Sequence, residues 1–144
     1  FARAEAVARR NFARVQFSAN TDFTCYSIYT APTIDPSTRC NCLSGPGAAC
    51  SGGFAEVKTV LLPRSGGVMV VPVGSGPGWE ATFAFDWRTG GLYANPTDNE
   101  PSPLDEFVIE SYVDTPRKLS TKLNRAGRPR VCSPSGSRMS EAPC

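Results

Sequence analysis

The chain of 144 residues contains no histidine, and this absence removes many familiar enzyme mechanisms. Histidine usually moves protons near neutral pH and completes Ser/His/Asp and Cys/His catalytic arrangements. Zinc sites built on histidine, and ribonuclease chemistry that needs two histidines, are excluded for the same reason. Acid/base catalysis by this chain would therefore have to rest on carboxylates.

The sequence also lacks a long hydrophobic run. Its longest uninterrupted apolar stretch is Val68 to Val71, whereas a membrane-spanning helix needs about 20 apolar residues. No membrane span is therefore expected. With 40% hydrophobic residues and a length typical of one domain, the chain has enough apolar surface to build a core.

The carboxylates that remain as acid/base candidates are poorly spaced for catalysis. Glu80 and Asp86 share one face of a predicted strand but lie about 20 Å apart, beyond the roughly 5 to 9.5 Å that separates glycosidase carboxylates. Asp105, Glu106 or Glu110 would have to approach one of them from another strand, and charged residues on a solvent-facing strand need no function. We predict that the protein is not an enzyme, with a histidine-free hydrolase as the second alternative function.

The six cysteines contain no Cys-x-x-Cys pair of the kind found in zinc ribbons and thioredoxins. We therefore predict three disulfides, no metal and no cofactor, in a protein secreted to the oxidising extracellular space. Two cysteines separated by a single residue should have different partners. Spacing leaves the full pairing open, but we favour a bridge that closes the C-terminal tail and a long-range bridge within the first four cysteines. The cysteines are Cys25, Cys40, Cys42, Cys50, Cys132 and Cys144.

Alternating hydrophobicity predicts an all-β fold. We expect residues 11–144 to form a single antiparallel β-sandwich or small β-barrel of about seven or eight strands. The pattern predicts an antiparallel meander for the segment 54–94 and a short strand or a turn of helix for 118–123. The predicted segments are 13–18, 23–30, 54–62, 68–73, 79–88, 92–94, 106–113, 118–123 and 129–133.

For two of these segments the pattern also predicts which face is buried. Residues 13–18 alternate apolar and polar side chains, which predicts a strand buried on one face only. In 79–88 the aromatic side chains share one face, and Trp87 would close the end of this apolar stripe. The adjacent Gly90 and Gly91 predict a tight hairpin turn directly after it.

The N-terminus is rich in alanine and arginine and does not begin with methionine, which suggests that an upstream signal peptide has been removed. Arg9 and Arg10 resemble a site for a kexin-type dibasic processing protease, so residues 1–10 would be the remnant of a propeptide. The alternative is an amphipathic helix with Ala4, Val7 and Ala8 on its apolar side and the arginines on the other.

Charge is unevenly distributed along the chain. Residues 1–14 carry +3, residues 115–144 carry +6 and the region between them carries −7. Such asymmetry can mark a basic binding face. The basic residues are scattered between prolines and serines without the interleaved aromatics of nucleic-acid sites. We therefore favour a solvated basic tail and expect no nucleic-acid partner.

Two surface features are candidates for recognition. Trp87, Arg88 and Tyr93 surround the predicted turn, where an aromatic ring beside a guanidinium can stack on a sugar or contact a protein. Pro101 and Pro103 lie in an exposed connection that offers another surface. The alternatives are a core role for Trp87, a cross-strand role for Tyr93 and a simple connector for the prolines.

The basic leader ending in Arg9 and Arg10, the six cysteines, the β-rich body and the absence of an N-glycosylation acceptor resemble a known class. It comprises small cysteine-rich proteins that plant-associated fungi secrete as effectors and necrosis-inducing toxins. The resemblance covers the layout of the chain without a family-specific motif, and bacterial secreted β-domains share these features. It implies an extracellular, non-enzymatic proprotein that binds a host extracellular protein or a cell-wall glycan. We expect a monomer, and a secreted carbohydrate-binding domain is the first alternative.

Overall fold

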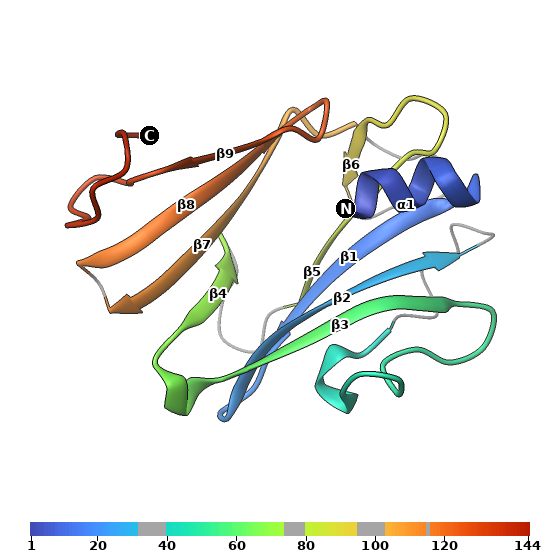
Figure 1. Cartoon of the computed structure of the whole chain (residues 1–144), viewed down its shortest axis with the longest axis horizontal. Helices are drawn as coiled ribbons and strands as arrows, with labels where there is room; N and C mark the ends of the chain where they lie inside the picture. Colours follow the sequence, from blue (N-terminus) through green and yellow to red (C-terminus); the bar gives the residue numbers. More distant parts are fainter. Residues whose placement is uncertain (32–39, 74–79, 95–102, 115) are drawn as a thin grey trace.

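The computed structural model describes residues 1–31, 40–73, 80–94, 103–114 and 116–144. These residues form two antiparallel sheets and one α-helix (Figure 1). In chain order the elements are α1 (Ala2–Arg9), β1 (Phe12–Ala19), β2 (Phe23–Ala31), the short 3-10 helix η1 (Cys42–Ser44), β3 (Ala55–Pro63), the 3-10 helix η2 (Arg64–Gly66), β4 (Met69–Pro72), β5 (Glu80–Phe85), β6 (Leu92–Ala94), β7 (Glu106–Asp114), β8 (Arg117–Asn124) and β9 (Pro129–Cys132).

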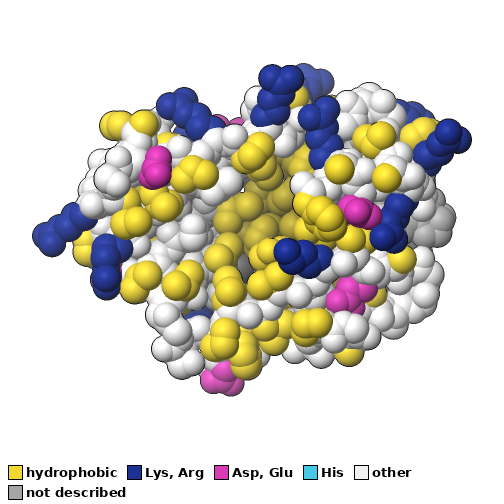
Figure 2. Space-filling view, in the orientation of Figure 1, with side chains coloured by type: hydrophobic (Ala, Val, Ile, Leu, Met, Phe, Trp, Pro, Cys, Tyr) yellow, Lys and Arg dark blue, Asp and Glu magenta, His cyan; other side chains and the backbone are white. Residues whose placement is uncertain are grey.

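The strands form two layers. Sheet A has the order β3-β2-β1-β5-β6, and sheet B has the order β4-β7-β8-β9. Figure 1 shows the sheets diverging from each other, with α1 beside β1. On the face drawn in Figure 2, hydrophobic side chains line a hollow between the sheets. The all-β prediction is confirmed, with nine strands among the described residues where about seven or eight were expected.

Among the described residues, only the β5–β6 pair of the predicted meander is present. β3 pairs with β2, β4 crosses to sheet B and pairs with β7, and β5 pairs with β1. Local alternation predicts that a strand forms, but it carries no information about which strand lies beside it. The proline in β4, Pro72, does lie in an edge strand, as its missing backbone N–H requires.

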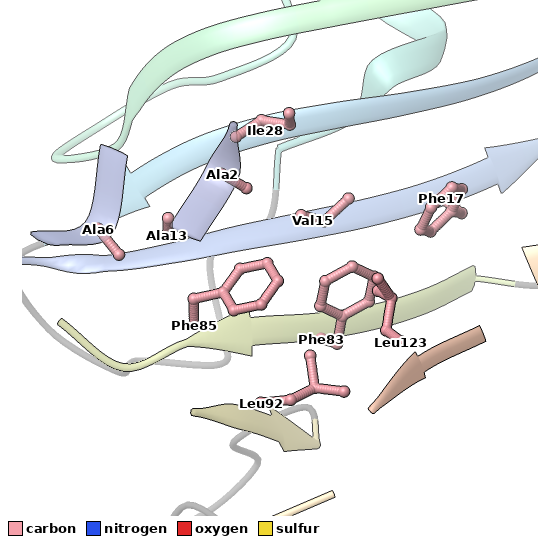
Figure 3. Close-up of a cluster of buried hydrophobic side chains, with 10 residues drawn as sticks. All are labelled: Ala2, Ala6, Ala13, Val15, Phe17, Ile28, Phe83, Phe85, Leu92 and Leu123. Atoms are coloured by element: carbon pink, nitrogen blue, oxygen red, sulfur yellow. The ribbon is translucent and has the colours of Figure 1, made fainter. Parts of the chain in front are cut away.

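The core is centred on β1 and β5 of sheet A. Phe83 is buried, with its ring centroid 5.5 Å from that of Phe85 and 4.6 Å from that of Phe107. Because Phe107 belongs to sheet B, this aromatic contact joins the two layers. The buried hydrophobic cluster, drawn in Figure 3, consists of Ala2, Ala6, Ala13, Val15, Phe17, Ile28, Phe83, Phe85, Leu92 and Leu123.

The second face of β1 is also buried, so the prediction of a strand buried on one face only is wrong. Arg14, Gln16 and Ser18 are at most 3% exposed. Cys25 lies opposite Ser18 in the β1–β2 register and is bonded to Cys42, which holds η1 over this face. Alternation separates the two faces correctly but does not reveal that a covalently closed segment covers the polar one. The Nε and Nη2 atoms of Arg14 have no hydrogen-bond partner in the part of the chain that the structure describes.

The three disulfides join Cys25 to Cys42, Cys40 to Cys50 and Cys132 to Cys144. The predicted C-terminal bridge, the long-range bridge among the first four cysteines and the separate partners of Cys40 and Cys42 are all confirmed. No cysteine is left free. The first bond attaches the segment 40–50 to β2 of sheet A, the second closes that segment on itself, and the third returns the C-terminal tail to β9.

Strand β5 ends at Phe85, three residues before the predicted end at Arg88. The carboxylate of Asp86 accepts hydrogen bonds from the backbone N–H of Arg88 (2.9 Å) and the hydroxyl of Thr89 (3.2 Å). The backbone carbonyl of Asp86 accepts another from the N–H of Gly90 (2.7 Å). An aspartate that bonds its own following backbone starts a turn. Trp87 therefore lies in this turn, and the predicted tight Gly-Gly turn is wrong. The hairpin itself is confirmed, because β6 pairs antiparallel with β5.

Helix α1 confirms the helical alternative for residues 1–10, but the predicted apolar side is wrong. Ala2 and Ala6 are buried, whereas Val7 and Ala8 are exposed. Ala4, which was also expected on the apolar side, is exposed. Ala2 and Ala6 are four residues apart and therefore share one face of the helix, where their small side chains allow a close approach to the core. No helix in the described ranges has the length and hydropathy needed to cross a bilayer.

Candidate functional site

An open hollow lies where edge strand β6 meets the turn between β8 and β9. Its volume is about 360 Å³. It contains an aromatic ring, a guanidinium and a hydroxyl, and we call it the Tyr93 hollow. Its lining residues are Thr89, Gly91, Leu92, Tyr93, Pro103, Arg125 and Ala126.

Three segments that are distant in sequence meet at Leu92 to build this hollow. The N–H of Leu92 donates to the carbonyl of Arg125 (2.9 Å), and the carbonyl of Leu92 accepts from the N–H of Leu104 (2.9 Å). Tyr93 forms an antiparallel bridge with Pro103. Backbone hydrogen bonds therefore fix the positions of the ring, the proline and the arginine relative to one another.

The turn that carries Arg125 is held by its own sequence. The side-chain oxygen of Asn124 accepts hydrogen bonds from the N–H groups of Ala126 (3.1 Å) and Arg128 (3.0 Å). Gly127 adopts a φ of 68°, which a residue without Cβ takes at little cost. The Asn-x-x-Gly pattern thus places Arg125 at the tip of a defined turn.

The guanidinium of Arg125 is the polar group of the Tyr93 hollow that is available to a ligand. The Nη1 atom of Arg125 is 3.8 Å from Oδ1 of Asp105, and the two side chains are 69% and 94% exposed. A loose pair of this kind contributes little to stability, so the guanidinium can instead bind an anionic group of a ligand. The hydroxyl of Thr89 already donates to Asp86 (3.2 Å) and accepts from the N–H of Gly91 (3.1 Å). The half-buried ring of Tyr93 adds a flat apolar face.

The structure divides the sequence-predicted binding residues into two groups. Tyr93 and Pro103 line the hollow together. Trp87 packs against the core, with the guanidinium carbon of Arg88 4.7 Å from its ring centroid. This arrangement favours the core role for Trp87. Pro101 lies outside the described residues.

Sequence reasoning missed Thr89, Ala126 and Arg125 as lining residues. Asn124 and Gly127 carry a readable turn signal around Arg125. That signal does not say that the turn lies against β6, because the contact depends on how sheet A and sheet B pack. Proximity of this kind is a tertiary property and has no local sequence pattern.

The carboxylates weighed for catalysis have structural partners. Asp105, Glu106 and Glu110 each lie 3.8 to 3.9 Å from a different basic side chain. They form a row of partly or fully exposed ion pairs between β7 and β8 and its following turn, and pairs of this kind contribute little to stability. The basic partners are Arg125, Lys122 and Lys118, in the same order.

Glu56 anchors the disulfide-closed segment outside the Tyr93 hollow. Burial raises the pKa of its carboxyl, but hydrogen bonds from the N–H of Gly47 (3.0 Å), from Thr59 and from the N–H of Ala49 (3.2 Å) outweigh that effect. The pKa of Glu56 is therefore lowered. Its charged form holds residues 47–49 against β3.

The dibasic pair predicted for processing lies at the end of α1. Arg9 and Arg10 are both exposed, and Arg9 forms a 2.8 Å ion pair with Glu5. Cleavage after Arg10 stays a prediction. It would remove Ala2 and Ala6, two members of the buried cluster.

Comparison of the chain with protein-family models, with curated proteins and with solved structures found no match. The likeness to effectors and toxins therefore stays at the level of class. A functional proposal for this chain has to rest on its own residues, above all on those of the Tyr93 hollow.

Proposed function

We propose that this chain is an exported, non-enzymatic binding protein of the effector or toxin kind, which recognises a host extracellular component through the Tyr93 hollow. Three disulfides support export, because such bonds persist outside the reducing cytosol. The observation that carries the proposal is the hollow itself. It combines an aromatic face, an exposed guanidinium and a hydroxyl on a hydrogen-bonded frame.

The component that best fits the hollow is a cell-wall glycan that carries carboxylates. A sugar ring presents an apolar face to Tyr93, while its carboxylate takes charge-assisted hydrogen bonds from Arg125. The volume of about 360 Å³ lies within the range of about 300 to 1,000 Å³ that small-ligand sites occupy. A typical protein partner instead covers about 800 Å² of surface.

A host protein is the second candidate, and the stacked pair of Trp87 and Arg88 favours it. Tryptophan and arginine are the residues most often responsible for binding energy at protein interfaces. Arg88 is exposed, while Trp87 holds it from a half-buried position. This pair lies outside the lining of the Tyr93 hollow, so substitutions can separate the two candidates.

A glycan array and a pull-down from host extracellular fluid, each run with three variants, test the proposal. Tyr93→Ala should weaken binding to acidic glycans at least tenfold, and Arg125→Gln should remove the preference for acidic over neutral glycans. Arg88→Gln is the matched control, because it removes an exposed guanidinium outside the hollow. Thermal unfolding of each variant verifies that it is folded.

Two results would count against the glycan proposal. Folded Tyr93→Ala and Arg125→Gln proteins that bind acidic glycans like the parent chain would remove the hollow from consideration. Loss of a captured host protein with Arg88→Gln alone would move the proposal to the Trp87 and Arg88 pair.

A further inference from the structure

A second concave surface lies at the other end of β8 from the Tyr93 hollow. Its volume is about 330 Å³. Sheet B, the residue preceding β4 and the C-terminal tail all contribute to it, and we call it the Val113 groove. Its lining residues are Val68, Ser111, Tyr112, Val113, Arg117, Leu119 and Met139.

The lining of this groove is mostly apolar and open to water. Val68, Val113 and Met139 are 43%, 42% and 40% exposed. Seven large hydrophobic side chains are this exposed in the described part of the chain, and three of them line this one groove. A local concentration of exposed apolar surface marks a binding site more often than scattered residues do. Methionine adds a side chain that adapts to the shape of a ligand.

The mouth of the groove carries an excess of positive charge. Arg117 is neutralised by Asp114, whose Oδ2 accepts hydrogen bonds from its Nη2 (2.6 Å) and Nε (2.9 Å). The hydrogen bond from Arg117 is the main reason that the pKa of Asp114 is lowered, and the charge of Arg138 acts in the same direction. Arg138 precedes Met139, and among the described residues its guanidinium makes no hydrogen bond or salt bridge. Arg117 and Arg138 thus share the single carboxylate of Asp114, so one positive charge is in excess beside Arg117, which lines the groove.

We propose that the Val113 groove binds a small anionic amphiphile, a hydrocarbon chain that ends in a carboxylate. The hydrocarbon contacts Val68, Val113 and Leu119, and the carboxylate lies at Arg138. The volume suits a small ligand, and the surplus cation selects an anionic head over a neutral one. A free amphiphile fits better than a membrane surface, because the apolar side chains line a concavity instead of protruding as a membrane-inserting face does.

Titration with saturated fatty acids of increasing length, each below its micelle concentration, tests this site by calorimetry. Burial of each added methylene should tighten binding about fourfold, the equivalent of about 0.8 kcal/mol, until the groove is filled. Decanoate should bind more tightly than decanol to the parent chain. Val113→Asp should weaken decanoate binding at least tenfold, and Arg138→Gln should make decanoate and decanol equal.

Val131→Asp is the matched control, because Val131 of β9 is 47% exposed and lies outside the groove. It should leave decanoate binding unchanged, and thermal unfolding verifies the fold of each variant. Equal binding by Val113→Asp and the parent chain would overturn the proposal. So would absence of decanoate binding together with binding to anionic phospholipid vesicles, which would assign the surface to a membrane. Because Tyr93→Ala should not affect decanoate, failure here is distinct from failure of the glycan proposal.

Discussion

The two sheets of this molecule differ in how completely they are covered. In sheet A, the central strand β1 is buried on both faces, by the hydrophobic cluster on one side and by the disulfide-closed segment on the other. In the strands of sheet B only four residues are buried, and the remaining side chains are half-buried or exposed. The four are Pro72, Ser120, Leu123 and Cys132.

This difference separates stability from recognition. Sheet A holds most of the buried apolar side chains, so it supplies most of the hydrophobic stabilisation. Sheet B keeps apolar and basic groups in contact with solvent, and both candidate binding surfaces lie at opposite ends of its strand β8. The well-covered centre of sheet A thus supports sheet B and the edge strand β6, whose side chains remain in contact with solvent.

The largest expected change in stability that tests this comparison concerns two phenylalanines in direct contact. Phe83 of sheet A is fully buried, whereas Phe107 of sheet B is half-buried. Phe83→Ala should lower the free energy of unfolding by about 3 to 5 kcal/mol, because it empties a large core site. Phe107→Ala should cost about half as much. Urea unfolding measures both values, and equal losses would mean that the two sheets are equally well packed at this contact.

The contrast between the sheets also marks how far the sequence could predict the fold. The period-two pattern predicted β1, β2 and β7 closely, because side-chain alternation is a local property of strands. It could not predict that β4 belongs to sheet B and not beside β3, since strand pairing depends on contacts between distant segments. It also could not predict that Arg14 is buried, because the cover over it comes from a segment closed by disulfides.

The candidate site was predictable to a similar degree. Tyr93 could be selected as an aromatic beside a predicted turn, and Pro103 as a proline in an exposed connection. Arg125 could not be added to them, since only the packing of the two sheets brings its turn to β6. Asp86 carried a readable turn signal, but the strong aromatic alternation in residues 79–88 hid it and extended the predicted strand too far.

The disulfides give the next test, because one holds the cover of sheet A and another holds the tail of sheet B. Cys25 and Cys42 are 17 residues apart and Cys132 and Cys144 are 12 apart, so loop-closure entropy for the two bonds differs by only about 0.3 kcal/mol. Each bond should contribute about 3 kcal/mol by that route.

If removing the two disulfides lowers the free energy of unfolding by amounts that differ more than this, the extra difference reflects how deeply each bond is buried. Both sulfurs of the first bond belong to buried residues, whereas Cys144 is exposed. Paired alanine substitution at Cys25 and Cys42 should therefore cost about 1 to 2 kcal/mol more than the same change at Cys132 and Cys144, through loss of buried side-chain volume. Urea unfolding measures the cost, and intact mass verifies that the other two bonds have formed. Equal costs would indicate that the cover of sheet A is as loosely packed as the tail.

The smallest expected effect concerns the carboxylate that anchors the cover of sheet A. Because hydrogen bonds lower the pKa of Glu56 in the folded chain, its contribution to stability is present above the pKa of the unfolded state and is lost as pH falls through the folded value. Glu56→Gln should therefore lower the free energy of unfolding at pH 7 by less than about 1 kcal/mol, since solvent still screens a carboxylate that is only half-buried. The deficit should shrink towards pH 3. Glu106→Gln in sheet B is the control, because its carboxylate lies 3.9 Å from Lys122 and anchors no covering segment. A deficit for Glu56→Gln that does not change with pH would contradict the anchoring role of its charged form.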